Sequence, residues 1–225
     1  NTDLSPLVRH PEFPVYHRQI FPYFWYISNS TEEIPEKERI RILAYDLKVL
    51  DKGCEELGIT LNEVQKQQFI TFYEYLVEKN KVMNLTGITE FDEVLVKHFL
   101  DSLCCVKAVD MNNVKTVMDI GTGAGFPGVP LKIAFPEVEA CLLDSLNKRV
   151  KFLEETFALL GLEGISAIHG RAEEYAKNKA YREKYDLCVS RAVSGLATLS
   201  EYCLPYVKVG GLFVSYKSGS VKEEA

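Results

Sequence analysis

One stretch of the chain predicts its architecture: Val117-Met-Asp-Ile-Gly121-Thr-Gly123-Ala-Gly125-Phe-Pro-Gly128. A short apolar run leads directly into three glycines at alternate positions, and Pro127 then opens a helical pattern. Glycines in this arrangement let the backbone turn sharply and approach a ligand without interference from side chains. The stretch therefore predicts a strand, a ligand-binding loop and a helix, in that order.

The sequence on the carboxyl side of this loop continues as an alternation of strands and helices. Five apolar runs are candidate strands, at residues 116–120, 139–144, 165–169, 186–190 and 212–216. Helical patterns separate them, most clearly at residues 146–160. Because parallel neighbours need a crossover of about a dozen residues, this order predicts a doubly wound α/β fold with a mostly parallel, Rossmann-like sheet.

The sequence on the amino side predicts two further parts. Residues 1–42, interrupted by five prolines, are expected to form an irregular arm that packs its aromatics on the domain or is disordered, rather than a platform for stacking bases. Residues 43–113 are expected to form a helical cap, and residues 114–225 the core. In the cap, helices are predicted over residues 43–57, from a capping box at Thr60-Leu-Asn-Glu63, and after Thr89.

Composition narrows the class of protein. Apolar residues make up 47% of the chain and charged residues 26%, which is typical of a folded domain in water. The formal charge of −6 disfavours a protein that coats nucleic acid, so any RNA site must be local. The six cysteines show no spacing typical of zinc sites or disulfides, and are expected to be reduced core thiols.

The ends of the chain and its hydropathy lead to two more expectations. No signal peptide and no apolar run of about 20 residues is present, which predicts a cytoplasmic location without a membrane segment. The chain starts at Asn1 rather than Met and stops within a charged stretch, which is typical of a truncated or processed product.

The spacing within the glycine loop discriminates between adenosine cofactors. A dinucleotide fingerprint would place its third glycine at position 126, which is Phe126, and no Gly-Lys-Ser/Thr ending follows for a phosphate loop. Asp144 ends the next predicted strand, about 20 residues on, where a ribose-binding carboxylate belongs. The pattern favours S-adenosylmethionine, which carries no phosphate, over the alternative of glycines that only make a tight turn.

Two segments resemble a known family. The segments Asp119-Ile-Gly-Thr-Gly-Ala-Gly-Phe-Pro-Gly128 and Asp144-Ser-Leu-Asn-Lys-Arg149 are similar to those of the RsmG or GidB family of bacterial 16S ribosomal RNA methyltransferases. Further stretches agree in order over about residues 43–217: Asn80–Thr86, Lys97–Ser102, Gly170–Glu173 and Ser190–Val193. The resemblance implies a class I S-adenosylmethionine-dependent methyltransferase that modifies guanine N7 in a loop of small-subunit RNA.

The resemblance also implies a set of cofactor-binding residues, all at or just beyond the carboxyl ends of predicted strands. They are Gly121, Phe126, Asp144, Ser145, Leu146, Ala172, Glu173 and Arg191. Ala172 and Glu173 would border the adenine, and Arg191 could contact the methionine carboxylate, guanine O6 or only a structural salt-bridge partner. No catalytic base is required, because guanine N7 has a lone pair and no proton to lose. No metal is expected either.

Other residues carry weaker expectations. His98 is expected to be a hydrogen-bonded packing residue rather than a catalyst. A basic rim for RNA phosphates, or merely a set of solubilising side chains, could be formed by Lys79, Lys81, Lys97, Lys148, Arg149 and Lys217. The expected partner is small-subunit ribosomal RNA or the ribosomal particle, and a monomer is favoured.

Two departures from the family and two alternatives accompany this interpretation. Residues 1–42 match nothing in the family, and the chain stops before the antiparallel strands that normally complete the sheet, which predicts an unpaired sheet edge. One alternative is a methyltransferase of the same fold with another acceptor. The other is a non-catalytic RNA-binding assembly factor that has lost the cofactor.

Overall fold

The computed structural model describes residues 45–191 and 195–217. The expected arm over residues 1–42 lies outside these residues, and so does Leu43, with which the first predicted helix began. The antiparallel strands expected to be missing concern positions beyond residue 217, which are likewise outside the described part.

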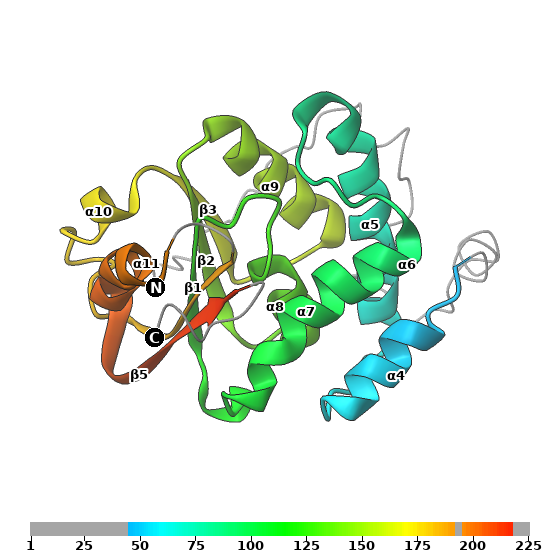
Figure 1. Cartoon of the computed structure of the whole chain (residues 1–225), viewed down its shortest axis with the longest axis horizontal. Coiled ribbons are helices and arrows are strands. Elements are labelled where there is room, and N and C mark those ends of the chain that lie inside the picture. The colour runs from blue at the N-terminus through cyan, green and yellow to red at the C-terminus, as the bar shows by residue number, and fades with distance from the viewer. Residues whose placement is uncertain (1–44, 192–194, 218–225) are drawn as a thin grey trace, which may run out of the picture. The chain divides into compact units, whose positions relative to one another are not determined.

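The sheet within the described residues has five parallel strands in the order β3-β2-β1-β4-β5 (Figure 1). The strands are β1 (Thr116–Ile120), β2 (Glu139–Asp144), β3 (Ile165–His169), β4 (Tyr185–Arg191) and β5 (Val207–Tyr216). The predicted parallel sheet is confirmed, and the first three strands have the predicted bounds. The chain winds outward from β1 in one direction and from β4 in the other, as a doubly wound fold does.

The fifth strand is twice as long as predicted. It begins at Val207 rather than at residue 212, and Val207 pairs with Tyr185 before the register shifts. Gly210 has a φ of +81°, so the backbone of the strand is irregular at this residue. The prediction was wrong here because Gly210-Gly211 reads as a loop, whereas the pairing with β4 continues through it.

Helices cover both faces of the sheet. On one face lie α8 (Gly128–Ala134) and α9 (Asn147–Leu160), and on the other lie α10 (Ala172–Tyr175) and α11 (Leu196–Cys203) (Figure 1). Alternate strand residues divide between the two faces. Met118 and Ile120 pack towards the α10 and α11 face with Leu199 and Tyr206, while Leu142 lies against the loop that opens α8. The apolar core therefore has two parts, one between each face of the sheet and the helices that cover it.

The cap precedes the sheet as a set of helices. It comprises α4 (Lys48–Glu56), α5 (Glu63–Met83), α6 (Phe91–Val94), a π-helical turn (Leu95–Leu100), α7 (Asp101–Leu103) and 3₁₀ turns at Cys104–Lys107 and Met111–Asn113. The expected cap is present, with helices in each predicted region, although the first helix runs from Lys48 to Glu56 and not from residue 43 to residue 57.

The start of α5 corrects one prediction. The capping residue is Asn62, not Thr60: the Asn62 side chain accepts from the Gln65 N–H at 2.9 Å, and Gln65 Oε1 accepts from the Asn62 N–H at 2.8 Å. Val64, near the start of the helix, is 43% exposed, whereas Phe69, Phe72 and Leu76 are buried where the helix packs on α8, α9 and the π-helical turn. An Asn two residues after Thr60 offered the better capping geometry.

Side chains of α5 also fasten the cap to the sheet helices. Gln65 Nε2 donates to the carbonyl of Ile133 at 2.8 Å and to that of Ala134 at 3.2 Å, at the end of α8. Gln68 Nε2 donates to the carbonyl of Leu160, the last residue of α9, at 2.9 Å. These bonds satisfy carbonyl groups that a helix leaves unpaired at its carboxyl end. The cap and the sheet helices thus share a hydrogen-bonded core.

Two sequence-based expectations about composition can be compared with the structure. All six cysteines are free, as expected, and five of them are buried. Cys104 is exposed, so the expectation that it is a core thiol was wrong. Its position in a surface 3₁₀ turn explains the difference. None of the helices in the described residues has the length and apolar content that crossing a membrane requires.

Candidate functional site

The candidate site lies at the carboxyl edge of the sheet, where the strand order reverses between β1 and β4. Open α/β sheets bind ligands at this reversal point. The loop that leaves β1 has three glycines in left-handed conformations, with φ of +71° at Gly121, +62° at Gly123 and +93° at Gly125. Other residues rarely adopt these angles, so the predicted glycine loop is explained by its backbone.

The glycines differ in what surrounds them. A Cβ atom on Gly125 would come within 2.6 Å of Val129 Cγ2, and one on Gly128 within 2.9 Å of Asp119 Oδ2. A Cβ atom on Gly123 would meet nothing within 4 Å. Gly125 and Gly128 are therefore required for close packing, whereas Gly123 presents bare backbone to open space.

Asp119, near the end of β1, accepts hydrogen bonds from two residues of the glycine loop. It is fully buried, and its Oδ2 accepts from the Thr122 hydroxyl at 2.7 Å and from the Gly128 N–H at 2.9 Å. Its Oδ1 is also buried and has no hydrogen-bond partner among the described residues. Burial raises the pKa of Asp119 to about 7 despite these bonds and the nearby Arg191 charge. The carboxyl group thus holds both ends of the loop and keeps one oxygen unpaired.

Asp144, the last residue of β2, reaches the loop from the neighbouring strand. Its side chain is 2% exposed; Oδ2 accepts from the Gly123 N–H at 2.9 Å and Oδ1 from the Leu146 N–H at 2.8 Å. Arg149 Nη1 lies 3.4 Å from Oδ2. A carboxylate has about four lone-pair positions, so acceptor capacity remains after these contacts. The predicted acidic residue therefore does face the glycine loop.

The other predicted contacts after β2 and β3 lie along the same edge. Ser145, Leu146 and Glu173 are exposed, with Leu146 43% accessible, and Ala172 is buried at the start of α10. The ends of β2 and β3 are joined, because the Gly170 N–H donates to the Asp144 carbonyl at 3.0 Å. The structure thus brings the predicted residues of β1, β2 and β3 to one edge.

Arg191, the last residue of β4, makes its contacts with the cap. Its Nη1 donates to the Lys97 carbonyl at 3.1 Å and to Asp101 Oδ2 at 3.0 Å, and its Nη2 lies 3.2 Å from His98 Nδ1. The guanidinium carbon lies 4.9 Å above the centre of the Phe126 ring. Three roles were considered for Arg191: contact with the methionine carboxylate, contact with guanine O6, and a structural salt bridge. The structure shows the salt bridge, with Asp101, and it lies at the same edge of the sheet as the glycine loop.

His98 is buried beside Arg191. Its ring stacks on Phe126 with centres 4.6 Å apart and planes 25° apart, and its Nε2 lies 2.7 Å from the Thr86 hydroxyl. Burial, and then the Arg191 charge, lower the pKa of His98 to about 4. The expected hydrogen-bonded packing residue is confirmed, and its ring is neutral at physiological pH.

Sequence reasoning did not single out Asp101 or Thr86, which complete this cluster. Both occur in stretches that resemble the family, but neither was assigned to the site. One signal could have found Asp101: it follows His98 by three residues on a predicted helix, so the two side chains share a face.

The predicted basic rim is only partly free to contact phosphates. Lys79 is paired with Glu155 at 2.8 Å, and Lys97 is paired with Glu93. Lys81 and Lys148 are exposed.

Among the described residues no group of three or more His, Cys, Asp or Glu side chains could hold a metal ion.

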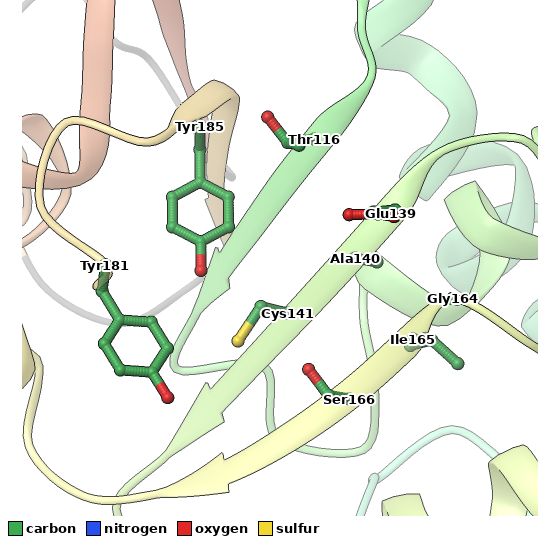
Figure 2. A pocket seen from close by; sticks show the side chains of 9 residues that line it. All are labelled: Thr116, Glu139, Ala140, Cys141, Gly164, Ile165, Ser166, Tyr181 and Tyr185. Atoms are coloured by element: carbon green, nitrogen blue, oxygen red, sulfur yellow. The ribbon is translucent and has the colours of Figure 1, made fainter. Parts of the chain in front are cut away.

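A cavity of about 370 Å³ lies at the opposite end of the strands (Figure 2). Thr116, Glu139 and Ile165 line it, and each is the first residue of its strand. The rings of Tyr181 and Tyr185 face this end of β2 (Figure 2). The cavity is therefore separate from the glycine loop, which follows the other end of β1.

Comparisons with known proteins agree with this geometry. Residues 65–225 match the family model GidB, described as rRNA small subunit methyltransferase G. Ribosomal RNA small subunit methyltransferase G of Lachnoclostridium phytofermentans is 55% identical over 173 residues, which cover 77% of this chain and 72% of that protein. The protein of the same name from Alkaliphilus metalliredigens is 53% identical over 176 residues, covering 78% of this chain and 74% of its own.

A solved structure supports the fold alone. The SAH-bound Podospora anserina methyltransferase PaMTH1 superposes with a TM-score of 0.51 at 14% identity, over 83% of this chain and 72% of that one. The described residues thus combine a methyltransferase-type sheet with open backbone at Gly123 and a buried carboxylate at the tip of the next strand.

Proposed function

Because the chain belongs to the GidB family, described as rRNA small subunit methyltransferase G, we propose that it methylates N7 of a guanine in small-subunit ribosomal RNA. It is an S-adenosylmethionine-dependent methyltransferase, as its family membership implies. The substrate atom and the loop context come from the family resemblance of the sequence. The observation that carries the proposal is the juxtaposition of the Asp144 carboxylate with the bare backbone of Gly123.

The residues at the carboxyl edge fit the cofactor. Open space above Gly123 leaves room for a ligand against the main chain. Asp144 retains lone pairs that can accept the two ribose hydroxyls, as a carboxylate at this position does in nucleotide-binding α/β folds. In this proposal Leu146, exposed just beyond β2, and Ala172 with Glu173, just beyond β3, would border the adenine.

The methionine end of the cofactor would lie towards β4. Arg191 ends this strand, and the neighbouring Asp119 has a buried oxygen without a partner among the described residues. A guanidinium is suited to bind a carboxylate with two parallel hydrogen bonds. We infer that Arg191 offers its remaining N–H groups to the methionine carboxylate while the cap holds its other side.

The chemistry requires little of the protein beyond positioning. When bound, the cofactor supplies an electrophilic methyl group on a positively charged sulfur. Guanine N7 has a free lone pair, so no side chain has to remove a proton. Holding the base in line with the methyl group and excluding water can supply about 7–11 kcal/mol of the barrier reduction.

The RNA substrate is expected to be a structured loop. The N7 edge of a guanine in such a loop can be reached without opening a long duplex. A bacterial ribosomal RNA substrate also places the reaction in the cytoplasm.

Methyl transfer to defined acceptors tests the proposal. Small-subunit particles, protein-free small-subunit RNA and RNA-free extract should be incubated with radiolabelled S-adenosylmethionine and the chain. Label in either of the first two, followed by chemical strand scission at a single N7-methylguanosine, is the expected result. Label only in the RNA-free extract would support a different acceptor. The absence of cofactor binding would favour the non-catalytic alternative.

A further inference from the structure

The cap changes helix type where it meets the candidate site. An α-helical turn at Phe91–Val94 is followed by a π-helical turn at Leu95–Leu100, and α-helix resumes at Asp101. π-Helical turns are rare and often occur at functional sites. All polar contacts of Arg191 described above come from this turn or from the residue that follows it. The turn is therefore the part of the cap that contacts the end of β4.

The guanidinium of Arg191 is fixed from one side. Nη1 is shared between the Lys97 carbonyl and Asp101 Oδ2, Nη2 lies against His98, and the Phe126 ring lies beneath the group. The Arg191 side chain is only 16% exposed. A planar group with two of its three nitrogens held in this way loses little further freedom when it binds a ligand.

His98 contributes to this arrangement only when it is neutral. Arg191 can donate but cannot accept, so its Nη2 contact is a hydrogen bond only if His98 Nδ1 carries no proton. His98 Nδ1 also lies 3.0 Å from the Lys97 carbonyl, to which it would donate if it carried the proton. We assign the other tautomer, because it lets Nδ1 accept from Arg191 while the Lys97 carbonyl still accepts from Arg191 Nη1. The proton then resides on Nε2, which donates to the Thr86 hydroxyl at 2.7 Å. The charged groups that act on the ring, Arg191 and Asp101, have opposite effects on its pKa.

Thr86 is itself held in place. Asn80 accepts from the Thr86 N–H at 2.9 Å and donates to the Thr86 carbonyl at 2.9 Å. The Thr86 hydroxyl also accepts from the Ile88 N–H at 3.0 Å. The network therefore runs from the end of α5 through Thr86 and His98 to Arg191, and Phe126 connects it to the glycine loop.

We propose that His98 and Asp101 are positioning residues that hold Arg191 against Phe126 for cofactor binding. The inference rests on the proposed function, because Arg191 is taken there to face the methionine end of the cofactor. Neither positioning residue needs to touch the cofactor. Loss of either frees a guanidinium that must then be ordered at the expense of binding free energy.

Binding of S-adenosylhomocysteine by isothermal titration calorimetry at neutral pH tests the proposal on the full chain. D101N should weaken binding about tenfold, D101E should restore part of the affinity, and H98F, which keeps a ring on Phe126 but offers no acceptor, should weaken it similarly. E93Q is the matched control, because Glu93 pairs with Lys97 on the same helical segment and makes no contact with Arg191. Its affinity should stay within about twofold of wild type.

A cofactor-free readout keeps the network testable by itself. In wild type, NMR titration should show His98 unprotonated down to a pKa of about 4. In R191Q the pKa should rise, because the Arg191 charge that helps to lower it is gone while burial still lowers it. An unchanged His98 titration, or wild-type affinity in both D101N and H98F, would overturn the inference while leaving the proposed function in place. Failure of wild type to bind S-adenosylhomocysteine would overturn the proposed function and this inference with it.

Discussion

The N–H of Gly123 donates a hydrogen bond of 2.9 Å to Asp144 Oδ2, so the tip of β2 orients a peptide group in the loop that leaves β1. The same carboxylate accepts from the Leu146 N–H and thereby also fixes the approach to α9. One buried side chain therefore shapes the loop and offers its remaining lone pairs at the edge where the cofactor is proposed to bind. Loop geometry and ligand recognition depend on the same residue.

Replacement of Asp144 by Asn should impair both roles. The amide would place a donor opposite either the Gly123 or the Leu146 N–H, which should reduce the free energy of unfolding by about 1–3 kcal/mol. Affinity for S-adenosylhomocysteine should fall more than about tenfold. Calorimetry and thermal denaturation measure the two effects. E137Q, on an exposed residue before the other end of β2, is the control and should change neither quantity. Wild-type affinity in D144N would contradict the ribose-binding role.

Alanine at Gly123 and at Gly125 should have different consequences. Both positions have a positive φ, but only a Gly125 Cβ collides with neighbours, at 2.6 Å from Val129. G125A should therefore be the more destabilising in denaturant unfolding, by about 1–3 kcal/mol relative to G123A. Conversely, G123A should remain folded and lose cofactor affinity, because its methyl group projects into the open space. Equal affinities for wild type and G123A would show that the ligand does not approach this backbone.

Asp119 should make stability depend on pH. Its pKa rises on folding from 3.8 to about 7 because the carboxyl group is buried. The unfolded chain therefore ionises first as pH increases, so this contribution to stability is complete below about 3.8 and is lost as pH rises through the window to about 7. D119N cannot ionise, so its melting temperature relative to wild type should increase between these pH values. A difference that does not vary with pH would reject the assignment.

Gln65 should contribute more to stability than its neighbour Gln68. Gln65 completes the capping box of α5 and donates to two carbonyls at the end of α8, whereas Gln68 donates to one carbonyl at the end of α9. Q65A should reduce the free energy of unfolding by about 2–3 kcal/mol, and Q68A by about 1 kcal/mol. Chemical denaturation of the two variants makes a matched comparison. A larger effect in Q68A would contradict the role of Gln65 as the main link.

Several features could be predicted from the sequence because they depend on local patterns. The bounds of β1, β2 and β3 follow from short apolar runs bordered by polar residues, and the glycine loop follows from residues adjacent in the chain. The pairing of Asp144 with this loop also followed, since parallel strands bring their carboxyl ends to one edge. The extension of β5 through Gly210-Gly211 could not be predicted, because pairing with β4 overrides the local preference for a turn.

The sequence by itself determined that a parallel sheet with a glycine loop and a carboxylate at the next strand tip would form, since periodicity and turn residues act over short distances. Only the tertiary structure decided how Arg191 is held. Its partners Lys97, His98 and Asp101 lie 90 or more positions earlier in the chain and are brought to it by the packing of the cap on the sheet. Hydrogen bonds of this kind depend on distances of a few ångströms between remote segments, which no local pattern encodes.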